Sequence, residues 1–186
     1  MKNKIGFNCS TFDLFHAGHV TMLKEEKRFC DYLIAAIQTD PTIDRPTTKN
    51  KPVQSIYERY SQVSACRYVD EVLVYSTEDD LLNLLKTQHI NIRFLGDEYK
   101  TKPFTGKQWC LDNGVELHYH LREHPYSSSA LRKRVYQAEY DKLNQSKGIN
   151  EYPNFALPTD TTNITGAMGS GAFNGTSAYD LGYTKK

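Results

Sequence analysis

The 186-residue chain has no long hydrophobic segment and almost no net charge. Its longest apolar run, residues 32–37, is far shorter than the roughly 20 residues that cross a bilayer, so membrane insertion is not expected. With 23 basic and 22 acidic residues the net charge is +1, whereas proteins that bind nucleic acid are normally plainly basic. The first residues do not form the apolar core of a signal peptide, which predicts a cytoplasmic protein.

Cysteine is scarce throughout, and glycine is scarce in all but the last part of the chain. The four cysteines lie far apart with no paired spacing, which favours reduced thiols over a disulfide framework or a zinc site. Six of the eleven glycines follow residue 146, where only four residues are Ile, Leu or Val. Such a composition does not readily offset the entropy lost on ordering. We therefore predict a domain at residues 1–145 and a Gly/Thr/Asn-rich tail at residues 146–186, either disordered or docked on a partner.

Short apolar runs alternate with amphipathic stretches of helical length through the predicted domain. The expected strands are residues 5–9, 32–37, 71–75, 92–95 and 115–119, and the expected helices are residues 19–29, 55–66, 78–88, 104–113 and 128–140. This alternation predicts an α/β domain with an open, five-stranded parallel sheet covered by helices on both faces. Ligands bind such sheets beyond the carboxyl ends of the strands, so functional residues are expected in the turns that follow strands.

The turn after the first expected strand, residues 10–19 (STFDLFHAGH), has the most specific pattern in the chain. His16 and His19 are three residues apart and lie on the same side of a helix start, and Gly18 between them lets a ligand approach the backbone. The free N–H groups and positive dipole end of that helix favour an anion, most naturally a phosphate chain. Two imidazoles there can donate hydrogen bonds to phosphate oxygens in a transition state. A single histidine would more simply be structural, but the whole block indicates a phosphate site.

Two later segments carry further groups that suit phosphate. The loop after the second expected strand contains Lys49 and Lys51, with Arg59 in the next helix, although either lysine could equally be an ordinary solvated residue. Arg122 precedes three hydroxyls at the start of the last expected helix, where helix N–H groups and a guanidinium fork can hold phosphate oxygens. Those hydroxyls belong to Ser127, Ser128 and Ser129.

Other polar residues have two interpretations each. Asp97, just past the fourth expected strand, could hold ribose hydroxyls or an amino group, or could simply cap the following turn. His118 and His120 share one face of the last expected strand, but no third metal ligand is near them in the sequence, so a metal site there is not favoured.

Residues 11–19 (TFDLFHAGH) resemble the T-F-D-x-x-H-x-G-H signature of the cytidylyltransferases, which belong to the HxGH nucleotidyltransferase superfamily and have a Rossmann-like fold. Residues 67–72 (RYVDEV), the pair Gly96-Asp97 and the three serines match further motifs, and the resemblance runs from about residue 5 to residue 135. It is strongest to glycerol-3-phosphate cytidylyltransferases, particularly the short versions encoded by tailed phages. Two departures leave the choice between CTP and ATP open: Ser10 replaces a common glycine, and REHPY at residues 122–126 replaces R-T-E-G-I.

The resemblance implies a nucleotidyltransferase that moves CMP from CTP to a small phosphorylated alcohol, with glycerol 3-phosphate as the best guess, and releases pyrophosphate. It also implies a homodimer, and Mg²⁺ carried by the triphosphate instead of a protein-only metal site. The catalytic residues implied are His16, His19, Lys49, Lys51 and Arg122. The nucleotide-binding residues implied are Ser10, Thr11, Phe12, His16, Gly18, His19, Gly96, Asp97, Arg122, Ser127, Ser128 and Ser129. The acceptor-binding residues implied are Asp13, Lys49, Lys51 and Arg59.

Two alternatives remain open from the sequence. The first is an adenylyltransferase of the same superfamily that uses ATP, because three serines followed by Leu131-Arg132 also resemble that branch. The second is a non-catalytic binding or assembly protein that docks on a partner through residues 146–186, where aromatic residues are spread among glycines.

Overall fold

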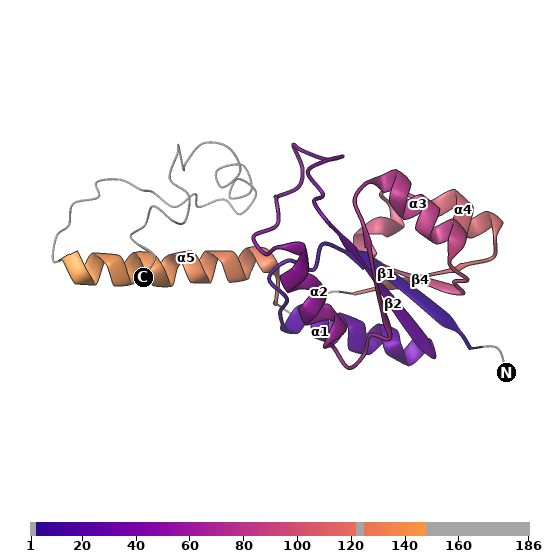
Figure 1. Ribbon diagram of the computed structural model, residues 1–186, viewed down its shortest axis with the longest axis horizontal. Coiled ribbons are helices and arrows are strands. Elements are labelled where there is room, and N and C mark those ends of the chain that lie inside the picture. The colour runs from indigo at the N-terminus through magenta and orange to yellow at the C-terminus, as the bar shows by residue number, and fades with distance from the viewer. Residues whose placement is uncertain (1–2, 122–124, 148–186) are drawn as a thin grey trace.

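The structure, a computed structural model, describes residues 3–121 and 125–147 (Figure 1). A single parallel sheet has the strand order β3-β2-β1-β4-β5. Its strands are β1 (Ile5–Ser10), β2 (Tyr32–Gln38), β3 (Glu71–Tyr75), β4 (Ile92–Gly96) and β5 (Glu116–His120). The predicted five-stranded parallel sheet is therefore confirmed. Because β2 and β4 both pair with β1, the strand order reverses there, and ligands bind open α/β sheets beyond the carboxyl ends of the strands at such a point.

Helices cover both faces of the sheet, as predicted (Figure 1). One face carries α1 (Ala17–Glu26) and α2 (Ile56–Ser64), and the other carries α3 (Glu78–Thr87) and α4 (Lys107–Asp112). Short 3-10 helices, η1 (Lys27–Phe29) and η2 (Asp97–Lys100), follow α1 and β4. The last helix, α5 (Ser128–Lys147), begins beside the sheet and extends away from it. Among the described residues, no helix combines the length and the apolar character needed to cross a bilayer.

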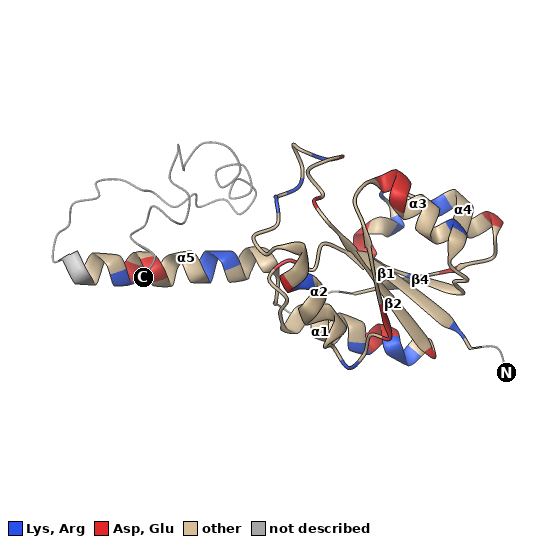
Figure 2. Ribbon diagram, in the orientation of Figure 1, with Lys and Arg blue, Asp and Glu red and all other residues tan. Residues whose placement is uncertain are grey.

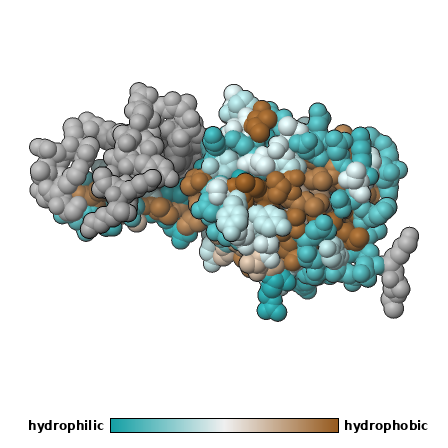
Figure 3. Space-filling model, in the orientation of Figure 1, coloured by the Kyte–Doolittle hydropathy of each residue, from teal (hydrophilic) through white to brown (hydrophobic). Residues whose placement is uncertain are grey.

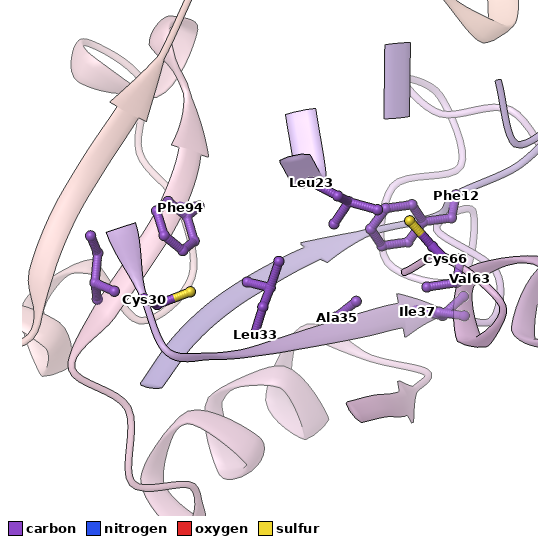
Figure 4. Close-up of a cluster of buried hydrophobic side chains, with 10 residues drawn as sticks. Phe12, Leu23, Cys30, Leu33, Ala35, Ile37, Val63, Cys66 and Phe94 are labelled. Atoms are coloured by element: carbon purple, nitrogen blue, oxygen red, sulfur yellow. The ribbon is translucent and has the colours of Figure 1, made fainter. Parts of the chain in front are cut away.

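Strand β2 is buried on both of its faces, because a parallel sheet between two helix layers has no face in water. Leu33, Ala35 and Ile37 pack in one apolar cluster with Leu23 of α1 (Figure 4). The alternate positions, beginning with Ile34, belong to a second cluster on the side of α3 and α4. The continuous apolar run in the sequence thus corresponds to a central strand.

Helix bounds differ from the predicted ones where local geometry decides them. Helix α1 begins at Ala17, two residues earlier than expected, because the side chain of His16 caps it. Helix α4 begins at Lys107 instead of residue 104, because Gly106 adopts a φ of 77° in the left-handed region, outside the helical range. Helix α5 continues to Lys147, past the expected end at residue 140 and into the first residues of the predicted tail. From residue 148 onward the predicted tail lies outside the described residues.

Charged residues lie mainly on helices and loops, and the strands carry few (Figure 2). Basic positions mark the loop that joins β2 and α2, which starts at the carboxyl end of the sheet. Apolar surface crosses the middle of the face in Figure 3, and Val53, Ile56 and Val74 are among the exposed apolar residues. The loop between β2 and α2 thus brings basic residues to the carboxyl end of the sheet, the end at which ligands bind open α/β sheets.

Candidate active site

Two adjoining cavities open at the carboxyl ends of the strands. The first, of about 300 Å³, is lined by His16, His19 and the three serines of α5 and its start, and we call it the histidine cavity. The second, of about 370 Å³, is lined by Arg45 and Arg93 among others, and we call it the arginine cavity. The residues common to both linings are Ser10, Thr11, Met22, Pro41, Lys49 and His120. The two cavities are therefore compartments of one site with room for two small reactants.

The signature turn between β1 and α1 has a strained backbone. Phe12 and Leu14 have φ angles of 51° and 50°, in the left-handed region that bulky residues rarely adopt. The Phe12 ring is fully buried, and the Thr11 carbonyl accepts a hydrogen bond from the Arg59 guanidinium (2.9 Å). Such strain persists where the surroundings enforce it, and it is concentrated at functional sites. The structure places Ser10, Thr11 and Phe12, three of the expected nucleotide-binding residues, on the wall of the histidine cavity.

His16 uses its two ring nitrogens differently. Nδ1 accepts a hydrogen bond from the backbone N–H of Gly18 (3.0 Å), so this nitrogen carries no proton. Nε2 lies 3.3 Å from the hydroxyl of Ser128, which already donates its proton to the carbonyl of Asp13 (2.9 Å). Nε2 is therefore the protonated nitrogen, and it donates to the serine oxygen. These contacts fix His16 as a neutral tautomer whose N–H edge is at the histidine cavity.

The ring of His19 is oriented in the same way as the ring of His16. Its Nδ1 accepts the backbone N–H of His16 (3.4 Å), which completes a reciprocal capping box. The two imidazoles stack with their centroids 4.0 Å apart and an angle of 23° between the rings, and the Phe15 ring stacks with His19 at 5.4 Å. Both Nδ1 atoms therefore face the backbone of the helix start, and both Nε2 edges are on the opposite side, at the cavity that the two rings line.

The three serines near the start of α5 have separate roles. The hydroxyl oxygen of Ser127 accepts the backbone N–H of Ala130 (3.1 Å) and caps the helix. Ser128 joins the helix to the signature turn through the two hydrogen bonds described above, and Ser129 contributes to the cavity wall. The amino ends of α1 and α5 consequently converge on one cavity, where their dipoles favour an anion.

The carboxylate of Asp13, expected to bind the acceptor, is hydrogen-bonded within the protein. Oδ1 accepts the backbone N–H groups of Val53 (3.0 Å) and Gln54 (2.9 Å), and Oδ2 pairs with Arg132 of α5. The Asp13 side chain is only 6% exposed. Asp13 therefore holds the signature turn against the start of α2 and against α5, and it also lines the histidine cavity.

Arg59, also expected to bind the acceptor, has its guanidinium hydrogen-bonded within the protein. Its side chain is buried, and its guanidinium donates to the carbonyls of Gln54, Thr11, Gln38 and Thr39 at distances of 2.7 to 3.1 Å. Arg59 lines neither cavity. Arg59 joins the ends of β1 and β2 to the start of α2, and its expected contact with substrate stays a prediction.

Of the remaining expected site residues, the structure places some at the cavities and others away from them. Lys49 lines both cavities, whereas Lys51 lines neither of them. Gly96 lines the arginine cavity, and Asp97, the first residue of η2, lines neither cavity. Arg122, expected to hold phosphate, lies outside the described residues. Of the two candidate lysines, the geometry therefore favours Lys49 as the one that reaches the reactants.

A buried polar group beside the site was not anticipated from the sequence. His120 lines both cavities, and its Nδ1 is 3.6 Å from the carboxylate of Glu26, which also accepts a hydrogen bond from the Asn8 amide (2.6 Å). Burial raises the pKa of Glu26 well above its ordinary value, because desolvation disfavours the charged form. The only sequence signal for this cluster was one polar residue at a core position in each of β1, α1 and β5, namely Asn8, Glu26 and His120. The tertiary structure brings these three residues together.

Arg93 was also not anticipated. It is the charged residue in the otherwise apolar strand β4, and its side chain lines the arginine cavity. Arg45 and Glu78 form an ion pair in the same wall, with 2.8 Å between the guanidinium and the carboxylate. The arginine cavity is therefore a polar compartment that contains buried positive charge.

The histidine cavity suits a magnesium ion that is carried by phosphate. Its lining carboxylates are Asp13, which the protein occupies, and Glu25. Within residues 3–121 and 125–147, no group of three or more His, Cys, Asp or Glu side chains is arranged to hold a metal. Magnesium usually retains several waters and binds through substrate phosphates. Magnesium carried by the triphosphate therefore stays a prediction.

The arrangement supplies alignment and charge stabilisation. Two imidazole N–H edges and two helix amino ends lie around the histidine cavity, and Lys49 lies where it meets the arginine cavity. Such donors stabilise negative charge that develops on phosphate oxygens in a transition state. A transfer between two bound phosphates needs chiefly this stabilisation and correct positioning of the reactants.

Comparison with known proteins agrees with this geometry. The family model described as cytidylyltransferase-like matches residues 7–134. Ethanolamine-phosphate cytidylyltransferase of Mus musculus is 33% identical over 153 residues, which cover 75% of this chain and 36% of that protein. The bifunctional protein HldE of Caulobacter vibrioides is 32% identical over 114 residues, which cover 61% of this chain and 23% of that protein. The chain thus spans about a quarter to a third of the length of these curated relatives.

Solved structures share the fold. A lipopolysaccharide core biosynthesis protein from Thermoplasma volcanium superposes with a TM-score of 0.51 at 21% identity, over 68% of this chain and 100% of that chain. A pantoate-beta-alanine ligase from Francisella tularensis gives the same TM-score of 0.51 at 20% identity, over 90% of this chain and 78% of that chain. At these identities the likeness shows a common α/β architecture and nothing about substrate.

Proposed function

Because the chain belongs to the cytidylyltransferase-like family, we propose that it transfers CMP from CTP to a small phosphorylated alcohol and releases pyrophosphate. The observation that carries the proposal is the stacked pair His16 and His19, whose Nε2 edges lie at one cavity beside a helix amino end. Glycerol 3-phosphate is the proposed acceptor. The relatives named ethanolamine-phosphate cytidylyltransferase support the reaction class and make ethanolamine phosphate a second acceptor to test.

In the proposed reaction an oxygen of the acceptor phosphate attacks the α-phosphorus of CTP. The new P–O bond forms as the bond between the α-phosphorus and the oxygen that bridges to the β-phosphate breaks, and pyrophosphate leaves. The triphosphate occupies the histidine cavity, where α-phosphate oxygens accept from the Nε2–H of His19 and replace the Ser128 hydroxyl as the acceptor of the His16 Nε2–H, as these oxygens gain charge. The acceptor extends into the arginine cavity, and Lys49 at the junction attracts the phosphates of both reactants. Magnesium, when bound to the triphosphate, neutralises part of its charge.

The test measures pyrophosphate release from CTP in the presence of each acceptor, with mass spectrometry of the nucleotide product. His16→Ala and His19→Ala should each lower turnover by about 10²- to 10³-fold, the effect of removing one oxyanion donor. His89→Ala is the matched control, because His89 is exposed and lines neither cavity. Turnover close to that of the wild type in both His16→Ala and His19→Ala would contradict the proposed roles.

Adenylyl transfer is the alternative within the same superfamily. The same assay with ATP separates the two, since pyrophosphate release from ATP and not from CTP, with every acceptor, would assign the adenylyl reaction. Release from neither nucleotide would favour a non-catalytic binding protein.

The homodimer expected from the resemblance stays a prediction. Light scattering on the full chain measures its mass directly, and a monomeric mass at the concentrations used in the assay would contradict it.

A further inference from the structure

Arg93 is the largest side chain that is fully buried in the described structure, and it is 2% exposed. One terminal nitrogen, Nη1, donates to the carbonyl of Thr105 (2.6 Å), and the guanidinium lies 5.1 Å from the centre of the Phe104 ring. The other hydrogen-bond acceptors of the guanidinium are the thiol sulfurs of Cys9 (3.8 Å) and Cys110 (3.9 Å), which are weak acceptors. No carboxylate in the described part of the chain pairs with Arg93, and its Nε has no hydrogen-bond partner there.

A buried guanidinium with such partners has no full counter-charge among them. Removing a charge from water costs free energy, and one carbonyl, a ring face and two thiols are weaker partners for a guanidinium than an anion is. Arginine does not relieve this cost by losing its proton, because its pKa is too high. The side chain lines the arginine cavity, so a ligand in that cavity can supply the missing negative charge.

The other charged residues of the arginine cavity do not supply that anion. Glu78 is paired with Arg45, and it also accepts a hydrogen bond from a threonine hydroxyl. The carboxylate of Glu98 lies against Gly96, within 3.0 Å of the position that a Cβ would take there. Lys49 adds a further positive charge where the two cavities meet. Of the five charged residues that line the cavity, three are basic, so the cavity favours an anionic ligand.

We propose that the arginine cavity recognises an oxyanion at the far end of the acceptor, a carboxylate or a further phosphate, and that Arg93 binds it. This inference rests on the proposed function, because it assigns the acceptor to the arginine cavity. It predicts that an acceptor with a cationic far end is discriminated against. It refines the proposed acceptor: glycerol 3-phosphate is still used, but the corresponding acid is used better.

Matched acceptors test the proposal. The compounds 3-phosphoglycerate, glycerol 3-phosphate and ethanolamine phosphate carry a carboxylate, a hydroxymethyl group and an ammonium group at the far end, and propane-1,3-diol bisphosphate carries a second phosphate. The measured quantity is kcat/KM for pyrophosphate release from CTP, or from ATP if that is the nucleotide used. The wild type should favour an anionic acceptor over glycerol 3-phosphate by about tenfold or more, as expected for charge-assisted hydrogen bonds. The better of the two anionic acceptors identifies the group.

Substitutions at Arg93 connect the preference to this residue. Arg93→Met should abolish the preference for the acid mainly by raising KM for the anionic acceptor, and Arg93→Lys should retain part of it. Arg28→Met is the matched control, because Arg28 is exposed and lines neither cavity. A merely structural role for Arg93 would lower thermal stability without changing the ratio of kcat/KM between acceptors. If Arg93→Met does not fold, Arg93→Lys provides the same comparison.

The outcomes distinguish this inference from the proposed function. Equal kcat/KM for all acceptors, or a preference for the acid that survives in Arg93→Met, would overturn the inference and leave the proposed function intact. If no acceptor supports pyrophosphate release, the proposed function fails, and calorimetric titration of 3-phosphoglycerate and glycerol 3-phosphate decides the inference. Tighter binding of the acid that depends on Arg93 would support the anion site, and equal binding of the two compounds would overturn it.

Discussion

His16 combines a structural role and a proposed chemical role in one ring, and substitutions can separate them. Its Nδ1 caps α1 through the N–H of Gly18, and its Nε2 edge is at the histidine cavity. Asparagine places a carboxamide oxygen close to the position of Nδ1 and is among the best N-cap residues, but it has no group at the position of Nε2. Glutamine can place an amide N–H near Nε2, but it is not among the preferred N-cap residues.

The expected magnitudes differ for the two roles. Loss of an N-cap lowers the free energy of unfolding by about 1 kcal/mol, which lowers the Tm of a domain of this size by roughly 2–4 °C. Loss of an oxyanion donor raises the activation free energy by about 2.7–4 kcal/mol, or 10²- to 10³-fold in turnover. His16→Asn should therefore keep nearly the stability of the wild type and lose turnover. His16→Gln should lose stability but turn over faster than His16→Asn, and His16→Ala should lose both.

Urea unfolding followed by circular dichroism gives the stability, and pyrophosphate release from CTP gives the turnover, on the same preparations. His89→Asn controls for the asparagine substitution at an exposed histidine that lines neither cavity. Turnover of His16→Asn at the wild-type level would refute the role of Nε2. A stability of His16→Asn as low as that of His16→Ala would refute the role of Nδ1 as the cap.

Three further predictions concern buried groups around the site. Asp13→Asn should lower the free energy of unfolding by about 2 kcal/mol, because it leaves the Arg132 guanidinium without its carboxylate partner, and the side chains of Asp13 and Arg132 are only 6% and 17% exposed. In an Arg132→Ala background the same substitution should lower the free energy of unfolding clearly less. An equal loss in both backgrounds would show that the ion pair is not responsible. The pKa of the Glu26 carboxyl is raised in the folded protein, whereas in the unfolded chain it has its ordinary value of 4.5. Between these two pKa values the unfolded chain has released a proton that the folded protein still holds, which favours unfolding. The contribution of Glu26 to stability is therefore complete below pH 4.5 and is lost as pH rises towards the folded-state pKa. Urea unfolding of Glu26→Gln should accordingly show a flatter fall of stability between roughly pH 5 and 8 than the wild type, and parallel curves would count against the raised pKa. Burial raises the pKa of the Cys30 thiol to about 11, so iodoacetamide at about pH 8 should alkylate half-buried Cys9 well before Cys30 in the native protein, and equal rates by mass spectrometry would contradict this.

The sheet was predictable because its signals are local. Residues 32–37 form a continuous apolar run, and they become the interior strand β2, which both helix layers bury. The signature turn was predictable for a related reason, since His16, Gly18 and His19 lie within one helical turn and their spacing alone places them together. Patterns that act over a few residues in this way do not depend on the rest of the fold.

The roles of Asp13 and Arg59 were not predictable in the same way. Both were expected to contact the acceptor because the family resemblance implied it. Their actual partners are backbone groups and a side chain 40 to 119 positions away for Asp13, and carbonyls up to 48 positions away for Arg59. A sequence shows that a residue can form an ion pair or a hydrogen bond, but it does not show which groups the fold brings within reach.

The sequence by itself determined the parallel α/β sheet, the helix that begins after β1 and the two imidazoles at its start, because short-range periodicity and helix geometry specify them. The tertiary structure alone decided that the start of α5 lines the histidine cavity and that Asp13 and Arg59 join distant segments around the site through hydrogen bonds. It also decided that Arg93 is buried beside the arginine cavity and that no carboxylate among the described residues pairs with it. These features depend on desolvation and on contacts between distant segments, and both arise only when the chain folds and packs.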